Sequence, residues 1–227
     1  RTVGIAADRS LPTFRRETFT DWFAQRGGAR VSEQGADRRV LLFPDTYTTY
    51  NKPEAGKAAV RALEAANVHV ALPEGTTGSG RPPHSKGFVE KARERVAANT
   101  YGVLEYIDAF RLDEQMAFGE ADDHLTYHGH CHQKAAKKDH HAVGVLRRAG
   151  YRVDPLDSTC CGMAGSFGYE AEHFSMSKAV GRLLFDQVDE SPGEQVIAPG
   201  ASCRTQLGDH YEESPPHPVE LLARAVR

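Results

Sequence analysis

The sequence predicts an α/β fold with two similar halves, each containing a βαβ unit of parallel strands. Three observations support this prediction. Short apolar runs alternate with amphipathic helical stretches, the order strand–helix–strand occurs twice, and a glycine-bearing loop follows the second strand each time. Strand, helix and strand at this spacing are typical of a βαβ unit, so we expect parallel pairing with right-handed crossovers.

The first half has its repeat between Arg38 and Pro82. We expect a strand at 40–43, a helix at 53–66 and a second strand at 68–72. A loop containing the stretch GSGRP (78–82) follows, and a further helix is expected at 88–98.

The second half repeats this order between His124 and Gly165. Strands are expected at 125–127 and 151–155, with helices at 134–149 and 169–185. A third strand at 195–198 precedes a Pro-Gly loop and a helix start, and a last helix begins at Pro218. The predicted domains are a helical lead-in (1–37), a first repeat without cysteines (38–123) and a second repeat with the cysteine site (124–227).

Composition narrows the classes of function. The chain has 227 residues, 40% hydrophobic and 26% charged, and its 28 basic and 31 acidic residues give a net charge of −3. No basic excess points to nucleic acid. No apolar run reaches the roughly 18–20 residues of a membrane span, and the N-terminus lacks the apolar region of a signal peptide. Because the chain does not begin with Met, we expect a piece of a longer protein.

The four cysteines all lie in the second half, and two of them are adjacent. A disulfide between neighbours would be strained, because adjacent Cα atoms are about 3.8 Å apart and disulfides usually span about 4.4–6.8 Å. Reduced cysteines in a cytoplasmic protein fit this pattern better than a secreted disulfide scaffold. The residues are Cys131, Cys160, Cys161 and Cys203.

Each of these cysteines follows a predicted parallel strand, so the thiols are expected to meet at one edge of the sheet. Gly162 lets the backbone turn tightly beside them. Four thiolates suit an iron–sulfur cluster or zinc. The spacing C-x28-C-C-x41-C differs from the paired C-x2-C of zinc ribbons, and adjacent ligands are awkward around one tetrahedral ion. We therefore favour an iron–sulfur cluster over zinc, and both over cysteines that act only as small buried hydrophobes.

Other polar residues near the cysteines are candidates for supporting roles. His128, His130 and His132 alternate around Cys131, so on an extended loop they would share one face. They are interpreted as metal ligands, as hydrogen-bond donors to thiolates or as plain loop residues. Glu170 and His173 are expected to start a helix, as site residues or as caps, and Arg204 either offsets thiolate charge or is solvated.

Three motifs carry a resemblance that extends over almost the whole chain: HGHCHQKA, DSTCCGMAGSFGYEAEH and APGASCR. The sequence resembles the cysteine-rich CCG domain found in one subunit of heterodisulfide reductase, in the glycolate oxidase iron–sulfur subunit and in one subunit of the anaerobic glycerol-3-phosphate dehydrogenase. The likeness is greatest to the C-terminal part of bacterial FAD-linked oxidases of the D-lactate or D-2-hydroxyglutarate dehydrogenase type.

The resemblance implies an electron-transfer module within an oxidoreductase. It implies a 4Fe-4S cluster on the four cysteines, FAD on another part of the chain or on a partner dehydrogenase subunit, and a quinone or disulfide as acceptor. It is compatible with peripheral contact at the inner face of the membrane. Two departures stand out: GSGRP occupies the place of the first Cys-Cys-Gly, with Thr48 or Thr49 at the place of Cys131, and a Pro-Ser-Cys segment between the halves is missing.

Two alternatives to electron transfer stay open at this point. The first is a structural or docking module braced by zinc, and the second is a thiol–disulfide reductase that uses Cys160 and Cys161 directly. As part of an FAD-linked oxidoreductase the piece is not expected to be active alone, whereas the thiol–disulfide alternative predicts activity that persists after metal removal.

Overall fold

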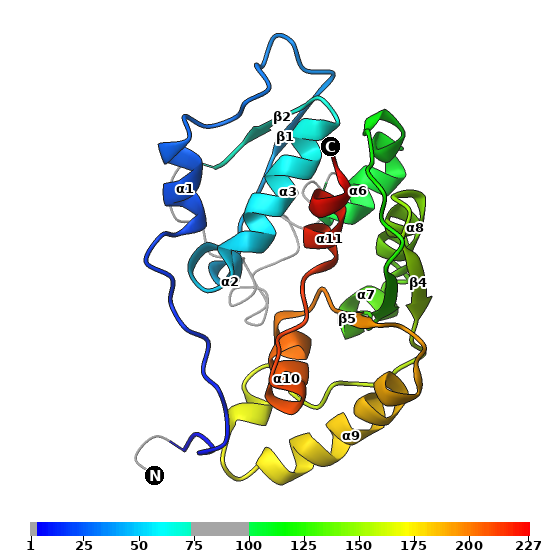
Figure 1. The fold of residues 1–227 in the computed structure, drawn as a ribbon. Coiled ribbons are helices and arrows are strands. Elements are labelled where there is room, and N and C mark those ends of the chain that lie inside the picture. Colours follow the sequence, from blue (N-terminus) through cyan, green and yellow to red (C-terminus); the bar gives the residue numbers. More distant parts are fainter. Residues whose placement is uncertain (1–3, 74–99) are drawn as a thin grey trace. The chain divides into compact units, whose positions relative to one another are not determined.

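The computed structural model describes residues 4–73 and 100–227, which form two compact units (Figure 1). Unit 1 comprises residues 1–12 with 118–225, and unit 2 comprises residues 13–117. The helix predicted at 88–98 and the GSGRP stretch lie outside the described residues.

Unit 2 contains a parallel pair of strands, β1 (Arg38–Leu41) and β2 (Val68–Ala71), with Arg38 opposite Val68. Two helices connect the strands, α2 (Thr46–Tyr50) and α3 (Pro53–Ala65), and Figure 1 shows α3 lying along the pair. The buried face of α3 includes Ala59, Val60 and Leu63. The predicted strand–helix–strand order and parallel pairing are confirmed, although β1 begins and ends earlier than expected.

The remaining elements of unit 2 flank this motif. Helix α1 (Phe19–Gln25) begins with a capping box in which Thr18 and Asp21 satisfy each other's backbone N–H groups. Helix α6 (Val103–Ala109) and the short 3-10 helix η1 (Leu112–Gln115) follow the undescribed stretch.

Unit 1 is built on a three-stranded parallel sheet in the order β4-β3-β5. The central strand β3 (His124–Tyr127) pairs with β4 (Arg152–Pro155) and β5 (Gln195–Ile197), which confirms the three predicted strands. Tyr127 lies opposite both Pro155 and Ile197, which puts the carboxyl ends of all three strands at one edge. The helices are α7 (Cys131–Ala135), α8 (His140–Arg148), α9 (Phe174–Glu190), α10 (Ala201–Tyr211) and α11 (Pro218–Ala225), with the 3-10 helix η2 (Phe167–Tyr169).

Leucine and isoleucine side chains from both sides of this sheet form the core of unit 1. Leu125 of β3 and Ile197 of β5 are fully buried, as are Leu146 of α8, Leu184 of α9 and Leu207 of α10. Burying one such side chain contributes about 1.5–3 kcal/mol. The sheet that carries the cysteine loops is therefore stabilised by a core of fully buried apolar side chains.

Two helix predictions in unit 1 were wrong. The expected helix at 134–149 is two helices, because Lys137 adopts the left-handed conformation (φ 54°) and ends α7. The expected helix at 169–185 starts only at Phe174, because Glu170 is extended (ψ 133°) and forms an isolated bridge with Ile5.

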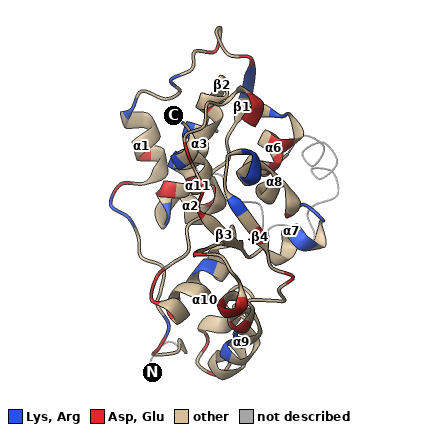
Figure 2. Cartoon of the chain, turned by 45° about the vertical axis from the view of Figure 1, so that its right-hand side comes forward, with Lys and Arg blue, Asp and Glu red and all other residues tan. Residues whose placement is uncertain are grey.

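The two halves share an order of elements, β1-α2-α3-β2 in unit 2 and β3-α7-α8-β4 in unit 1. The duplication and the three domain boundaries stay predictions. No helix in the described ranges 4–73 and 100–227 is long and apolar enough to cross a membrane. Figure 2 shows acidic and basic residues interspersed along the ribbon of these residues.

Candidate metal centre

The structure places the four cysteines where the three strands of unit 1 end. Cys131 is the first residue of α7, after β3, and Cys203 lies in the first turn of α10, after β5. Cys160 and Cys161 lie in the loop that follows β4. Cys161 and Cys203 are buried, Cys160 is half-buried and Cys131 is exposed. The site thus has a closed inner side and an open outer side.

The adjacent cysteines contact different partners. Cys161 pairs with Cys203, and Cys160 pairs with Cys131. The hydrogen bond from Cys203 lowers the pKa of the Cys161 thiol, with a further contribution from the neighbouring side chain of His128. The same bond raises the pKa of Cys203. Desolvation, together with the Cys160 and Cys161 thiols, raises the pKa of Cys131. The four thiols are therefore close enough to interact electrostatically.

These opposed shifts bear on whether a metal centre fits. Thiolates crowded together repel, so the four groups are not all ionised unless a positive centre lies among them. Around one zinc ion, tetrahedral bonds of about 2.3 Å would hold the sulfur atoms about 3.8 Å apart. In the described part of the chain, no three of the thiol sulfurs form a group within 4.8 Å of one another. Thiols that are close in pairs but not gathered in threes around one point fit a multi-metal centre better than one ion.

Lys134 ties the Cys131 helix to the loop that precedes Cys160. Its Nζ donates hydrogen bonds to the carbonyl oxygen of Ser158 at 2.6 Å and to the Ser158 hydroxyl at 3.0 Å. That hydroxyl also lies 2.6 Å from Nδ1 of His128, which is fully buried. Two of the cysteine-bearing segments are thus held together by a charged hydrogen-bond network.

Two glycines allow the close approaches on which the site depends. Gly162 has a φ of +87°, and a Cβ there would overlap the carbonyl oxygen of Ser177. A Cβ on Gly200 would lie 2.5 Å from the His130 ring and 2.9 Å from the Cys203 sulfur. The loops after β3 and β5 therefore meet at Gly200.

The three predicted histidines do not share one face, because the extended loop ends where α7 begins. His128 is fully buried, His132 is exposed, and His130 is the N-cap residue of α7. The His130 and His132 ring centroids are 5.0 Å apart, and His130 Nδ1 accepts the His132 backbone N–H at 3.3 Å. The His128 side chain interacts with the Cys161 thiol and helps to lower its pKa.

The other predicted residues have local partners. Glu170 lies before α9, with its Oε2 atom 2.7 Å from Nδ1 of His173, and the His173 ring stacks on Phe167. Arg204 is buried and lies 3.7 Å from Glu220. Their roles toward a metal centre, like the ligand roles of the cysteines, stay predictions.

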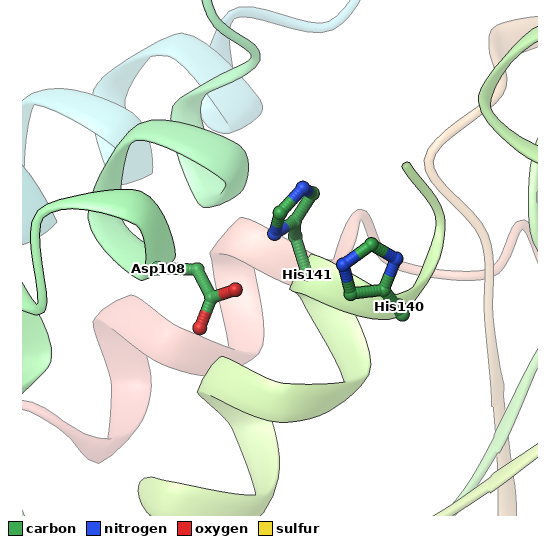
Figure 3. A group of neighbouring side chains, drawn as sticks. All are labelled: Asp108, His140 and His141. Atoms are coloured by element: carbon green, nitrogen blue, oxygen red, sulfur yellow. The ribbon is translucent and has the colours of Figure 1, made fainter. Parts of the chain in front are cut away.

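Two further histidines lie at the start of α8. The His140 and His141 ring centroids are 4.0 Å apart (Figure 3). Asp108, also labelled there, belongs to α6 of unit 2. None of the three was predicted as a site residue.

Sequence patterns alone do not identify Lys134, Ser158 and Gly200. Ser158 stands inside the motif DSTCCGMAGSFGYEAEH, and Lys134 comes three residues after Cys131, a spacing that places both on one side of a helix. The Pro-Gly pair before Cys203 predicts only a turn. Helical spacing could have pointed to Lys134, but no local signal pairs it with Ser158.

The segment that holds the cysteines matches a known family. Residues 125–208 match the model of the CCG cysteine-rich domain. The matched region begins in β3 and extends through Cys203 into α10, so it holds all four thiols.

Two kinds of relative match over most of the chain. A subunit of the anaerobic glycerol-3-phosphate dehydrogenase of Escherichia coli is 26% identical over 96% of this chain and 66% of its own length. D-2-hydroxyglutarate dehydrogenase of Escherichia coli is 25% identical over 86% of this chain and 23% of its own length. D-2-hydroxyglutarate dehydrogenase of Pseudomonas putida is 31% identical over 34% of this chain and 8% of its own length. No solved structure matches the chain.

The first match extends over 264 positions, more than the 227 residues of this chain. The relative therefore has residues without a counterpart here. The chain spans just under two thirds of the glycerol-3-phosphate dehydrogenase subunit and about a quarter of the hydroxyglutarate enzyme.

Proposed function

We propose that this chain is the iron–sulfur electron-transfer module of a flavin-linked dehydrogenase. The observation that carries the proposal is the meeting of four thiols from three strand ends, with Cys160 and Cys161 each directed to a different thiol. Adjacent ligands that diverge suit a cluster, because a cluster offers them separate iron atoms. The CCG match of residues 125–208 and the dehydrogenase relatives support the same class.

The cluster would take up and release single electrons. Cys131, Cys160, Cys161 and Cys203 would hold it as thiolates. His128 and Lys134 would fix the loop before Cys160 through Ser158. Burial of Cys161 and Cys203 would keep water from the inner side, while exposed Cys131 would mark the side from which electrons enter or leave.

The finer parts of the proposal concern the rest of the reaction. One relative is a subunit of a glycerol-3-phosphate dehydrogenase, and another is a hydroxyglutarate dehydrogenase more than four times as long as the matched part. We expect a flavin domain, on a partner subunit or elsewhere on a longer chain, to oxidise a 2-hydroxy acid and deliver electrons here. A quinone or disulfide as acceptor, peripheral membrane contact and a cytoplasmic location stay predictions.

The proposal is tested by anaerobic purification followed by measurement of iron, sulfide and zinc per chain and by the visible spectrum. We expect a brown protein with several irons and sulfides, and loss of both the colour and the iron in Cys160→Ser. Gly165→Ala, at an open position of the same loop, serves as the matched control and should keep its iron.

Other results would overturn the proposal in distinguishable ways. A colourless protein with about one zinc per chain would indicate a structural site. A metal-free protein that reduces disulfides, and loses this activity in Cys161→Ser, would indicate thiol chemistry.

A further inference from the structure

Arg9 is a buried charged residue of unit 1, with a side-chain exposure of 0%. Its guanidinium makes four polar contacts. Nε donates to the Gly168 carbonyl oxygen at 2.6 Å and Nη2 to Ser177 Oγ at 2.8 Å. Nη1 donates to Gln206 Oε1 at 2.5 Å and to Asp209 Oδ2 at 3.0 Å. The neighbouring carboxylate of Asp209 balances the buried charge.

The partners of Arg9 lie on three segments that surround the thiols. Gly168 lies in η2, just after the loop that carries Cys160 and Cys161, and Ser177 belongs to α9. Gln206 lies three residues after Cys203 on α10. Each segment reaches the same guanidinium from 159 to 200 residues away in the sequence.

The contacts continue from Arg9 to the cysteines. Gln206 Nε2 donates to the Ser177 carbonyl oxygen at 3.1 Å, which joins α10 to α9. That carbonyl oxygen lies against Gly162, the residue after Cys161. The Cys161 backbone and the Cys203 helix are therefore both held in place by contacts that lead back to Arg9.

The segment that carries Arg9 is itself held against the cysteine loop. The Ala6 N–H donates to the Tyr169 carbonyl oxygen at 2.8 Å, and the Ala171 N–H donates to the Gly4 carbonyl oxygen at 2.7 Å. Figure 1 shows this blue segment beside the yellow segment before α9. Residues 4–9 and 168–171 thus run together in unit 1.

We propose that Arg9 is a positioning residue of the metal centre, which sets the distance between the Cys161 and Cys203 segments. This inference rests on the proposed function. Only a planar guanidinium reaches three segments in fixed directions, whereas a lysine is a single point charge. Arg9→Lys keeps the charge and most of the stem, but the three N–H donors of its ammonium group cannot serve all four partners.

The test is anaerobic cluster reconstitution of Arg9→Lys, followed by the rate of iron release to a chelator. Loss of an outer partner of a metal site typically weakens metal binding by about 10–100-fold, so iron release should be at least about tenfold faster than in the wild type. The cluster's electron paramagnetic resonance signal should also change, because the Cys161–Cys203 separation changes. Wild-type release and an unchanged signal would overturn the proposal.

Two controls separate positioning from general destabilisation of unit 1. Leu146→Ala empties a fully buried site of the core, and Tyr151→Phe removes a buried hydrogen bond to Leu221. Both should keep wild-type iron release at temperatures where circular dichroism shows a folded protein. If Leu146→Ala releases iron as fast as Arg9→Lys, Arg9 acts through stability alone and the proposal fails.

A second measurement needs no metal. In the metal-free protein, alkylation of buried Cys161 and Cys203 should be about tenfold faster in Arg9→Lys than in the wild type. Ser177→Ala alone should give a smaller increase in the alkylation rate. Added to Arg9→Lys, it should give no further increase, because both residues belong to the same network. If the wild type binds no iron, the proposed function fails, but the alkylation rates still decide the role of Arg9. Equal rates in the wild type and Arg9→Lys would exclude that role.

Discussion

The β3-β4 pair of unit 1 and the β1-β2 pair of unit 2 have the same type of connection, two helices between parallel strands, but only the connection in unit 1 carries a cysteine. Each first strand leads into a short capped helix, then a longer helix and a parallel second strand. In unit 2 the Asp45 carboxylate caps α2 by accepting the Thr48 N–H at 2.6 Å. In unit 1 His130 caps α7, and the next residue is Cys131.

Aligned on these caps, Thr46 of unit 2 corresponds to Cys131 of unit 1. This differs from the correspondence with Thr48 or Thr49 that the sequence suggested. The difference between the units teaches that this connection forms whether or not it carries metal-binding side chains. A thiol at the first helical position, the Cys160–Cys161 pair after β4, and a third strand followed by the helix that carries Cys203 are what make unit 1 a candidate metal centre.

Removal of the metal should produce the largest difference in stability between the two units. Chelation should destabilise unit 1 strongly, because binding to folded thiolates is linked to folding, and should leave unit 2 unchanged. Hydrogen exchange followed by peptide mapping checks this, with protection lost in peptides of β3 and α10 and kept in α3. Equal loss in both units would show that they do not respond separately.

Gly162→Ala should have the next largest effect. Alanine at φ +87° costs roughly 1–2 kcal/mol, and overlap of its Cβ with the Ser177 carbonyl oxygen adds about 1–3 kcal/mol. Gly165→Ala has a similar φ of +72° but nothing within 4 Å of its Cβ, so it shows only the first cost. Urea unfolding measures both, and equal changes would contradict the close approach.

Lys134→Met should destabilise unit 1 by about 1.5–3 kcal/mol, since it removes charged hydrogen bonds to Ser158 and leaves those oxygens without this donor. It should also accelerate iron release. The control Lys57→Met removes the half-buried pair with Glu17 in unit 2 and should not affect iron. Iron loss in both variants would show that iron retention does not depend specifically on the contacts of Lys134.

The smallest expected effect is a pH dependence of unit 1. Burial lowers the pKa of His217 to about 3, against about 6.5 in the unfolded chain. The folded state therefore binds fewer protons between these values, and stability that is complete above pH 6.5 falls as the pH approaches 3. The loss from pH 7 to pH 5 should be about 2 kcal/mol at most.

Urea midpoints at pH 7 and pH 5 measure this dependence. His217→Asn, which keeps an acceptor near the Val219 N–H, should flatten it. An unchanged slope in that variant would assign the dependence to other groups.

The sequence predicts the periodic parts of the fold well and its irregular joints poorly. The strands and the helix at 53–65 follow from apolar spacing and Pro53. The break at Lys137 does not, because a lysine in the left-handed conformation ends α7 where no glycine marks the turn. The late start of α9 does not either, because Glu170 forms a bridge with the distant Ile5.

The candidate site divides in the same way. The convergence of thiols follows from parallel topology, which places the ends of successive strands at one edge. The pairing of Cys160 with Cys131 and of Cys161 with Cys203, the burial of His128, and the Arg9 network depend on three-dimensional packing across long sequence separations. No local pattern encodes such contacts.

The long separations around Arg9 also order events in time. During synthesis Arg9 leaves the ribosome well before any of its partners, and Cys203, Gln206 and Asp209 are among the last residues of this chain to emerge. A nascent chain that has not yet reached α10 has an unbalanced arginine and an incomplete set of thiols. A metal centre on these four thiols would therefore be loaded late, after the last strand of the sheet has been translated.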